Sequence, residues 1–331
     1  LPNNCIMHVQ LLDKDAQWQQ LLLGMLGVNL IHACFSYDNP EKIILALSDN
    51  LNQDRFQVDM FSIVGPDFAQ VDNRLMSLLL VKNGLSHSAM FGPKGNVLQA
   101  SEALHKKNVL VLRGRFRPVT NVSVDMMLNG LKVIKEESEM EKSHLLAITE
   151  LALHDLTLEG EIDEADYLDR VDLLCALGQT VLISNYREHY KLASYLSNIT
   201  QRMKLRIICG LGNLKDIFDE SYYENLKGGI IESFAQLFAL NVKIYVYPAL
   251  IDDKIKTIHD FVPSHHLIDL YKFLLSNQKI IGIKGAKTNL LSIVSDEVLS
   301  LIKKGDKKWE EMVPRRVTQI IKEKHMFSIR M

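Results

Sequence analysis

The sequence predicts an α/β protein whose strands are mostly parallel, arranged either in one or more Rossmann-like sheets or in a barrel. Short runs rich in β-branched residues alternate along the chain with longer stretches whose apolar residues recur at helical spacing. This alternation is typical of repeated βαβ units. The chain has 331 residues, of which 47% are hydrophobic, so it can bury one large core or two smaller ones.

The predicted strands are short apolar runs bounded by turn residues. Together they are numerous enough for two sheets or one barrel. They are Cys5–Leu11, Asn29–Phe35, Val58–Val64, Ser88–Phe91, Asn108–Arg113, Thr180–Asn185, Leu205–Cys209, Val242–Tyr247 and Lys279–Ile283.

The predicted helices are amphipathic stretches that lie between these runs. Their ends carry matching signals, because Asn39-Pro40 suits a helix start and Gly84 and Gly178 suit helix ends. The helices expected are Asp15–Leu26, Pro40–Leu51, Phe68–Asn83, Glu139–Leu156, Glu164–Leu177, Glu188–Thr200, Leu214–Asn225, Ile230–Leu240 and His265–Ser276.

A boundary between two halves is expected near residues 135–160. The run 135–142 is charged, and 157–163 lacks apolar periodicity. We therefore expect a first α/β half over 1–135 and a second over 136–331 that ends in charged helices, with one continuous domain as the alternative.

Composition argues against several classes of partner. The 38 Lys and Arg residues nearly balance the 40 Asp and Glu residues, so no overall positive field favours nucleic acid or an anionic membrane. No apolar run reaches the roughly 20 residues that span a bilayer, and no signal-peptide pattern opens the chain, so we expect a cytoplasmic protein. Neither the four cysteines nor the histidines have metal-ligand spacing, which predicts buried thiols in a reducing compartment and no metal site.

The candidate site is a run of arginines at the end of a predicted strand. Ligands of parallel α/β sheets bind beyond the carboxyl ends of the strands. Arg113, Arg115 and Arg117 follow such a strand, and guanidinium groups suit phosphate or carboxylate. The alternative is that these arginines tie loops together by pairing with acidic residues such as Asp59, Asp72 or Asp125.

Two further segments are candidates for ligand contacts. Gly228 and Gly229 precede a predicted helix and could donate backbone N–H groups to an anion, although a plain turn is the alternative. Glu232 is the carboxylate beside them and the candidate acid–base group. At the end of another predicted strand, Ser184, Asn185 and Tyr186 are candidates to orient the ligand.

Several enzyme motifs are absent. The chain has no G-x-S-x-G elbow and no Walker-type phosphate loop, and a G-x-G at Gly210–Gly212 lacks the third glycine of a dinucleotide fingerprint. No cofactor can be named from the sequence.

Two hypotheses follow. In the first, the protein is an enzyme of unknown reaction that binds a phosphorylated or carboxylated small molecule, with a nucleotide as one candidate. In the second, it is a non-catalytic scaffold that meets a protein partner or a second copy of itself. The two differ in whether the arginines face an open pocket or carboxylate partners.

Five segments are distinctive in wording, namely VDNRLMSLLLVKNGL, RGRFRPVTNVSVDM, LCALGQTVLISNYREHYKLASYL, IFDESYYENLKGGIIESFAQLF and VKIYVYPAL. They resemble segments of a largely uncharacterised bacterial family whose members are often catalogued as nicotinate-nucleotide adenylyltransferase or as TonB-dependent receptor. The resemblance runs from around His8 to 309–314 and implies that an N-terminal part of the family protein precedes these residues. The first name implies a nucleotidyltransferase that needs a divalent metal ion and releases pyrophosphate from ATP. The chain lacks the H-x-G-H and I-S-S-T-x-x-R segments expected of that enzyme, so the name transfers no catalytic residue.

Overall fold

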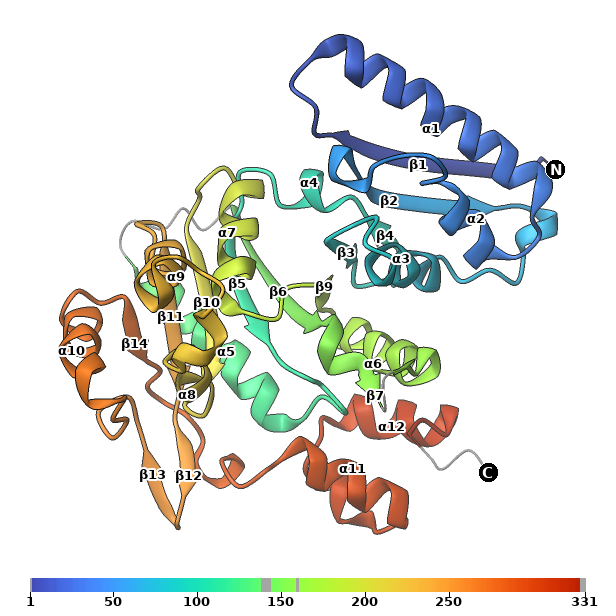
Figure 1. The fold of residues 1–331 in the computed structure, drawn as a ribbon. Coiled ribbons are helices and arrows are strands. Elements are labelled where there is room, and N and C mark those ends of the chain that lie inside the picture. Colours follow the sequence, from blue (N-terminus) through green and yellow to red (C-terminus); the bar gives the residue numbers. More distant parts are fainter. Residues whose placement is uncertain (1, 138–143, 159–160, 328–331) are drawn as a thin grey trace.

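The computed structural model describes residues 2–137, 144–158 and 161–327. Its centre is an open eight-stranded sheet with helices on both faces (Figure 1). The strand order is β14-β11-β10-β5-β6-β9-β3-β4, and the six strands from β14 to β9 are parallel. The α/β class and the mostly parallel sheet that the sequence predicts are therefore confirmed, in the Rossmann-like form. The strands are β3 (Ser88–Phe91), β4 (Val97–Leu98), β5 (Asn108–Arg113), β6 (Leu145–Ala152), β9 (Thr180–Ser184), β10 (Leu205–Gly210), β11 (Val242–Tyr247) and β14 (Ile280–Gly282).

The order of the parallel strands creates a switch point beside β5. The chain runs from β5 to β6 and β9 on one side, then returns to place β10 against the other side of β5. The connections that follow the carboxyl ends of β5 and β10 therefore run in opposite directions. Ligands of doubly wound sheets bind in the crevice between two such connections.

Burial explains why these segments are central strands. The first five residues of β5 are buried, as expected for strands that are covered on both faces. Because side chains alternate, Leu110 and Leu112 enter one core and Val109 and Val111 the other. The first core includes α3 (Asn73–Lys82), α5 (Asn121–Glu136), α6 (Glu164–Ala176), α11 (Ser295–Lys304) and α12 (Arg315–Lys324). The second includes α4 (Ala100–Ala103), α7 (His189–Ile199), α8 (Asn213–Ile217), α9 (Gly229–Leu237) and α10 (Ile268–Ser276).

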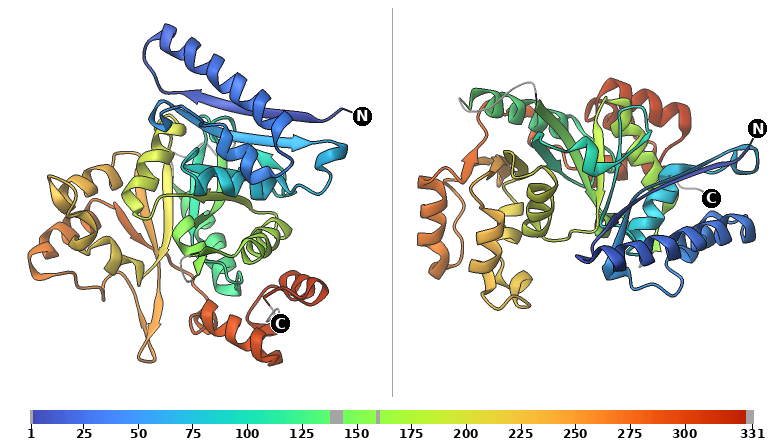
Figure 2. Two further views of the ribbon diagram at one scale, coloured as in Figure 1. Left: turned by 45° about the vertical axis from the view of Figure 1, so that its right-hand side comes forward. Right: turned by 90° about the horizontal axis from the view of Figure 1, so that it is seen from above.

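The N-terminal segment forms a separate layer with its own core. Strands β1 (Asn4–Leu11) and β2 (Phe56–Val64) pair antiparallel, and α1 (Ala16–Ser36) and α2 (Pro40–Ala46) pack on them. Helix α3 joins this layer to the sheet, because Leu79 enters the N-terminal core and Leu78 the first sheet core. Figure 2 shows α1 on the outside of the molecule in both views. Two short antiparallel pairs complete the strands, namely β7 (Thr157–Leu158) with β8 (Glu161–Ile162) and β12 (Ala249–Ile251) with β13 (Lys254–Lys256).

Two predicted elements are wrong. The segment predicted as helix over Glu139–Leu156 contains β6, which lies between β5 and β9. A short apolar run suits a buried strand and a buried helix equally well, and here the neighbouring strands decide. Asn29–Phe35, predicted as a strand, is the last part of α1, because no helix stop separates it from the preceding turns.

Helix α5 was not predicted, although Thr120 caps its start by accepting the Ser123 N–H. The sheet takes β3 to β5 from before residue 135 and the remaining strands from after it. The division near residue 135 stays a prediction. Within the residues described, no helix is both long enough and apolar enough to cross a bilayer.

Candidate functional site

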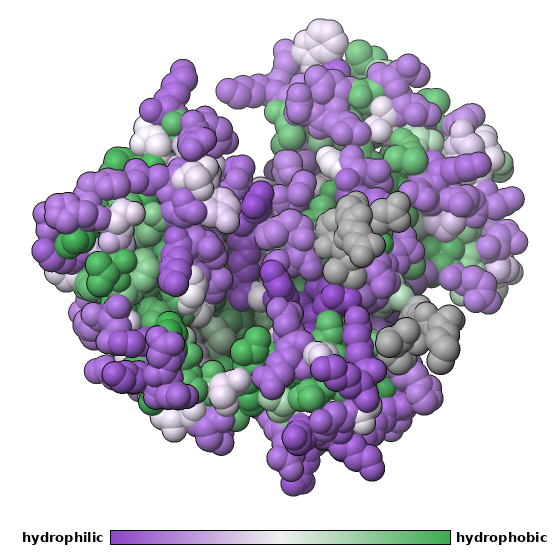
Figure 3. All heavy atoms as spheres, turned by 60° about the horizontal axis from the view of Figure 1, so that its bottom comes forward, coloured by the Kyte–Doolittle hydropathy of each residue, from purple (hydrophilic) through white to green (hydrophobic). Residues whose placement is uncertain are grey.

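A cavity of about 610 Å³ lies at the switch point, beyond the carboxyl ends of four neighbouring strands. Its walls come from the segments that follow β5, β6, β9 and β10, together with Ser295 at the start of α11. Figure 3 brings this side of the molecule forward and shows a hollow with a mostly hydrophilic rim. The lining residues are Arg113, Gly114, Arg115, His154, Asp155, Arg187, Glu188, His189, Asn213, Asp216, Tyr222, Tyr223 and Ser295.

The floor of the cavity is a buried network across three strands. Arg113 of β5 lies opposite Glu150 of β6 in the strand register, and its Nε is 3.1 Å from the Glu150 carboxylate. Ser184, at the end of β9, donates to the other Glu150 oxygen at 2.6 Å. Arg113 also donates to the Tyr186 carbonyl. Two charges are thus held in the sheet, and an unpaired charge would be costly there.

The network leaves one donor unused. The Arg113 side chain is 8% exposed, and its buried Nη1 has no hydrogen-bond partner in the part of the chain that the structure describes. Burial raises the pKa of Glu150, although the positive charge of Arg113 and the Ser184 hydrogen bond act in the opposite direction. Native proteins seldom leave a buried polar atom unpartnered, so the free donor of Arg113 is a feature to be explained.

Arg115 is the most accessible of the predicted arginines. Its side chain is 62% exposed, and it lies 3.5 Å from carboxylate oxygens of Asp155 and Asp296. Exposed ion pairs of this kind contribute at most about 1 kcal/mol. Arg115 can therefore turn to a ligand at little cost.

A third guanidinium, Arg187, reaches the cavity from the segment after β9. It is exposed and forms no ion pair within the described ranges, and its carbon lies 5.4 Å from the centre of the Tyr222 ring. A cation at this distance is held weakly over the ring face. The cavity therefore has a charged side chain stacked on an aromatic one.

Two histidines face the same space. The ring nitrogens of His189 make no hydrogen bond among residues the structure describes, and burial, with the nearby charges of Arg113 and His154, lowers its pKa to about 3. Burial also lowers the pKa of His154. The negative charge of Asp155 raises this pKa, whereas the positive charges of Arg113, Arg187 and Arg115 lower it further. Both rings are consequently neutral at pH 7, and a neutral imidazole donates one hydrogen bond and accepts another.

The start of α7 forms another part of the wall. Glu188 is its N-cap residue, and no side chain of the described ranges caps the helix. The first N–H groups of a helix attract anions when they are left unpaired. Within residues 2–137, 144–158 and 161–327, the cavity included, no three His, Cys, Asp or Glu side chains gather as they would around a metal ion.

Arg117 does not line the cavity. Its Nε donates to the Asp166 carboxylate at 2.5 Å, and Asp166 also pairs with Arg170. The partners of the three arginines are thus Glu150, Asp155, Asp296 and Asp166. The partners suggested from the sequence, Asp59, Asp72 and Asp125, are wrong, because those carboxylates are engaged by His8, Arg74 and Tyr247.

The glycine pair has partners within the chain. The Gly228 N–H donates to Glu232 at 2.9 Å, and the Gly229 N–H donates to the Leu226 carbonyl at 3.1 Å. Glu232 therefore caps the start of its own helix, α9. None of the three lines the cavity, and their assignment to a ligand stays a prediction.

The predicted segment at the end of β9 is divided among different surroundings. Ser184 is fully buried in the network, the Asn185 N–H donates to the His87 carbonyl, and the Tyr186 ring packs on His87 and Tyr195. Ser184 and the Tyr186 carbonyl join the network at the floor, as partners of Glu150 and Arg113, but neither residue lines the cavity. Whether these residues orient a ligand stays a prediction.

Arg187, His154 and His189 are among the cavity residues that sequence reasoning missed. His189 and Arg187 follow the predicted strand Thr180–Asn185 within four residues, so reading slightly further past the strand end would have found them. His154 follows β6, which was predicted as helix, so no strand end drew attention to it.

Comparisons with known proteins give only distant likenesses. No family model matches the chain, and no curated protein matches it. Nicotinic acid mononucleotide adenylyltransferase of Plasmodium falciparum, complexed with APC, is similar at 12% identity and a TM-score of 0.41 over 67% of this chain and 97% of that one. The same enzyme complexed with NaAD gives 13% identity and a TM-score of 0.39 over the same shares. Likeness this distant assigns no role to a cavity residue.

Proposed function

We propose that the cavity at the switch point binds a small molecule that carries a phosphate or carboxylate group. The observation that carries this proposal is that Arg115 and Arg187 line one cavity, at the crevice where doubly wound sheets bind ligands, and neither has a carboxylate closer than 3.5 Å. The uncapped start of α7 and the free Nη1 of Arg113 support it. The anion lies against these groups.

A nucleotide is the ligand class we propose first. The cavity volume of about 610 Å³ is in the range of sites for whole small molecules and far exceeds that of one phosphate. Tyr222 and Tyr223 line it beside the arginines, so a flat ring has an aromatic side chain to pack on while its phosphates meet the guanidinium groups. His189, neutral and without a protein partner among the described residues, can donate a hydrogen bond from its ring N–H to a phosphate oxygen of the bound molecule.

The scaffold hypothesis also has support at two positions. Arg113 and Arg117 are held by the carboxylates of Glu150 and Asp166, as expected of arginines that tie loops together. The two functions therefore differ in whether the side chains of Arg115 and Arg187 bind a ligand.

A thermal-shift panel of nucleotides, sugar phosphates and organic acids tests the proposal, because a bound ligand raises the apparent melting temperature by mass action. We expect at least one compound to stabilise the wild type and to lose most of that effect on Arg115→Ala. Arg316→Ala removes an exposed arginine outside the cavity and serves as the matched control, with an unchanged shift. A panel without any shift, or an equal shift in Arg115→Ala, would contradict the proposal.

The nucleotidyltransferase activity implied by the family resemblance is a narrower proposal about the same cavity. It predicts pyrophosphate release when ATP, a mononucleotide and a divalent metal ion are supplied together. His189→Ala should weaken nucleotide binding and slow that release, because the ring N–H of His189 is assigned to a phosphate oxygen of the nucleotide. Nucleotide binding without any release would leave the binding proposal standing and remove the activity.

A further inference from the structure

Helix α1 presents an uncharged surface on the outside of the molecule. Its 21 residues, Ala16–Ser36, include no Asp, Glu, Lys or Arg. In Figures 1 and 2 it lies at the edge of the N-terminal layer, on the far side of that layer from the large sheet. A surface helix normally carries charge on its solvent side, so this one is unusual.

The helix is apolar on two opposite sides. Leu22, Leu26 and Ala33 are buried in the N-terminal core. On the other side, the exposed fractions are 53% for Leu21, 65% for Val28, 62% for Ile31 and 90% for Phe35. The exposed side chains therefore face solvent without a covering element.

The outer residues follow the spacing of a coiled-coil seam. Leu21, Gly24, Val28, Ile31 and Phe35 are separated alternately by three and four residues, which is the a/d pattern by which one helix packs along another. We call these five residues the α1 seam. A Cβ built on Gly24 would meet nothing within 4 Å, so a neighbouring helix can approach closely at this point.

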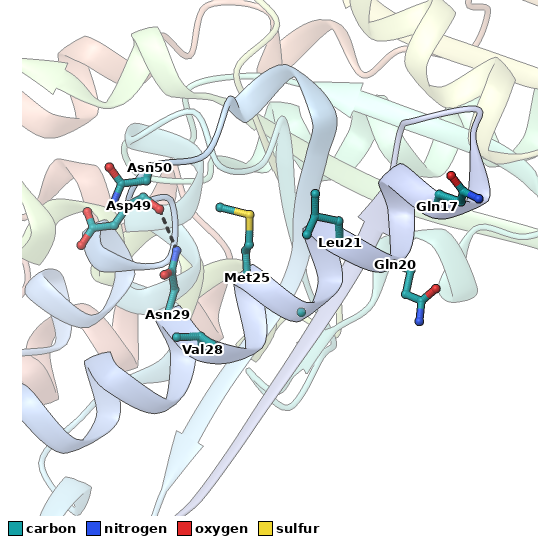
Figure 4. A pocket seen from close by; sticks show the side chains of 9 residues that line it. Gln17, Gln20, Leu21, Met25, Val28, Asn29, Asp49 and Asn50 are labelled. Atoms are coloured by element: carbon teal, nitrogen blue, oxygen red, sulfur yellow. Dashed lines mark hydrogen bonds between the residues drawn. The ribbon is translucent and has the colours of Figure 1, made fainter.

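The α1 seam is preformed. Figure 4 shows Leu21, Met25 and Val28 along α1, with Asn29, Asp49 and Asn50 at the end where Val28 lies. The Asn29 side chain donates to the carbonyls of Leu47 and Asp49, both at 3.0 Å. The helix is thereby fixed to the segment after α2, and pairing would order little that is not already ordered.

We propose that the α1 seam is a dimer interface in which α1 of one copy packs along α1 of a second copy. Two copies of a helix that carries no Asp, Glu, Lys or Arg meet along it without like-charge repulsion. With its apolar neighbours Trp18 and Leu23, the seam exposes on the order of 600 Å² per copy, near the roughly 800 Å² per partner of a standard interface. A twofold axis matches the same surface to itself.

The test compares the mass in solution of wild type and Val28→Glu by sedimentation equilibrium. We expect the wild type to be a dimer and Val28→Glu to have half that mass, because the substitution places a charge in the centre of the seam. Val262→Glu is the matched control, since Val262 is 75% exposed and outside α1. It should remain dimeric.

Circular dichroism of Val28→Glu should match that of wild type, because residue 28 already faces solvent in one copy. A wild-type chain with the mass of one copy at every soluble concentration would overturn the proposal, as would a dimer that Val28→Glu leaves intact. Co-sedimentation of wild type with phosphatidylcholine vesicles, lost in Val28→Glu, would overturn it in favour of a lipid surface. Ligand-induced thermal shifts should be equal in both proteins, which separates this inference from the cavity.

Discussion

At the scale of single residues, the main feature is the pair of opposite charges, Arg113 and Glu150, that is buried in the sheet. Each charge is acceptable inside the sheet only because the other is beside it, and Ser184 satisfies a further Glu150 oxygen. Arg113 also lines the cavity, and its buried Nη1 has no hydrogen-bond partner among the described residues. The pair thus has a structural role, and we propose that it also prepares the site for a ligand.

Removing one member of this pair should be worse than neutralising both. Arg113→Met leaves Glu150 buried without its partner and should lower the free energy of unfolding by roughly 3–5 kcal/mol. Adding Glu150→Gln removes the unpaired charge and should recover part of that loss. Urea unfolding of the two single variants and the double variant measures this, and strictly additive losses would show that the two charges are not coupled.

The second residue-scale prediction concerns His189 and pH. Its pKa is about 3 in the folded chain and roughly 6.5 when unfolded. Between these values the unfolded chain holds a proton that the folded chain does not. The stabilising contribution of the neutral ring is therefore complete above about pH 6.5 and is lost as the pH falls toward 3, by at most about 1.4 kcal/mol per pH unit.

Urea unfolding at about pH 7 and about pH 5 measures this contribution. As the pH falls from 7 to 5, the free energy of unfolding of the wild type should decrease by roughly 2 kcal/mol more than that of His189→Asn. Replacing the exposed His105, which is outside the cavity, by Asn is the control and should follow wild type. Equal losses in wild type and His189→Asn would refute the low pKa.

What the sequence could predict at this scale was the position of a strand end. Arg113 and Arg115 follow a clear strand, and both line the cavity. The sequence could not tell which arginine would meet a carboxylate, because Glu150 and Asp166 belong to β6 and α6 and approach only in the folded sheet. Gly228 is another such case, since its N–H is taken by Glu232 four residues later.

Helices and strands were predictable where their patterns were unambiguous. The predicted segments Glu164–Leu177 and Glu188–Thr200 correspond to α6 and α7 within one residue at each end. The ambiguous segments were short and mostly apolar, and only the neighbours in space decide between strand and helix for them. For β6 those neighbours are β5 and β9, and for the end of α1 they are α2 and its following loop.

Helix ends give a prediction at the scale of elements. Gly305 ends α11 in the left-handed conformation, with φ of 70°. Gly305→Ala should destabilise the protein by about 1 kcal/mol, because a Cβ is disfavoured in that conformation. Gly27 lies inside α1 with nothing within 4 Å of its Cβ position, so Gly27→Ala should stabilise by roughly 0.5–1 kcal/mol. The melting temperature should therefore fall in Gly305→Ala and rise in Gly27→Ala. A change in the same direction in both variants would contradict this account of the two glycines.

The arrangement of the whole molecule is what the sequence could not supply. Periodicity predicts strands and helices, but the order β14-β11-β10-β5-β6-β9-β3-β4 depends on which strands pair. That order places the ends of β5 and β10 side by side and so creates the cavity. The separate N-terminal layer likewise emerges only from packing, and it puts the α1 seam on the opposite side of that layer from the sheet.

A crystal structure grown with millimolar inorganic pyrophosphate tests the central claim most directly. The account predicts the anion in the cavity, within hydrogen-bond distance of the Arg115 and Arg187 guanidinium groups and near the start of α7, with Arg115 turned away from Asp155 and Asp296. A cavity without pyrophosphate, with both arginines bound to carboxylates of the chain, would contradict the claim that this crevice is built to hold an anion.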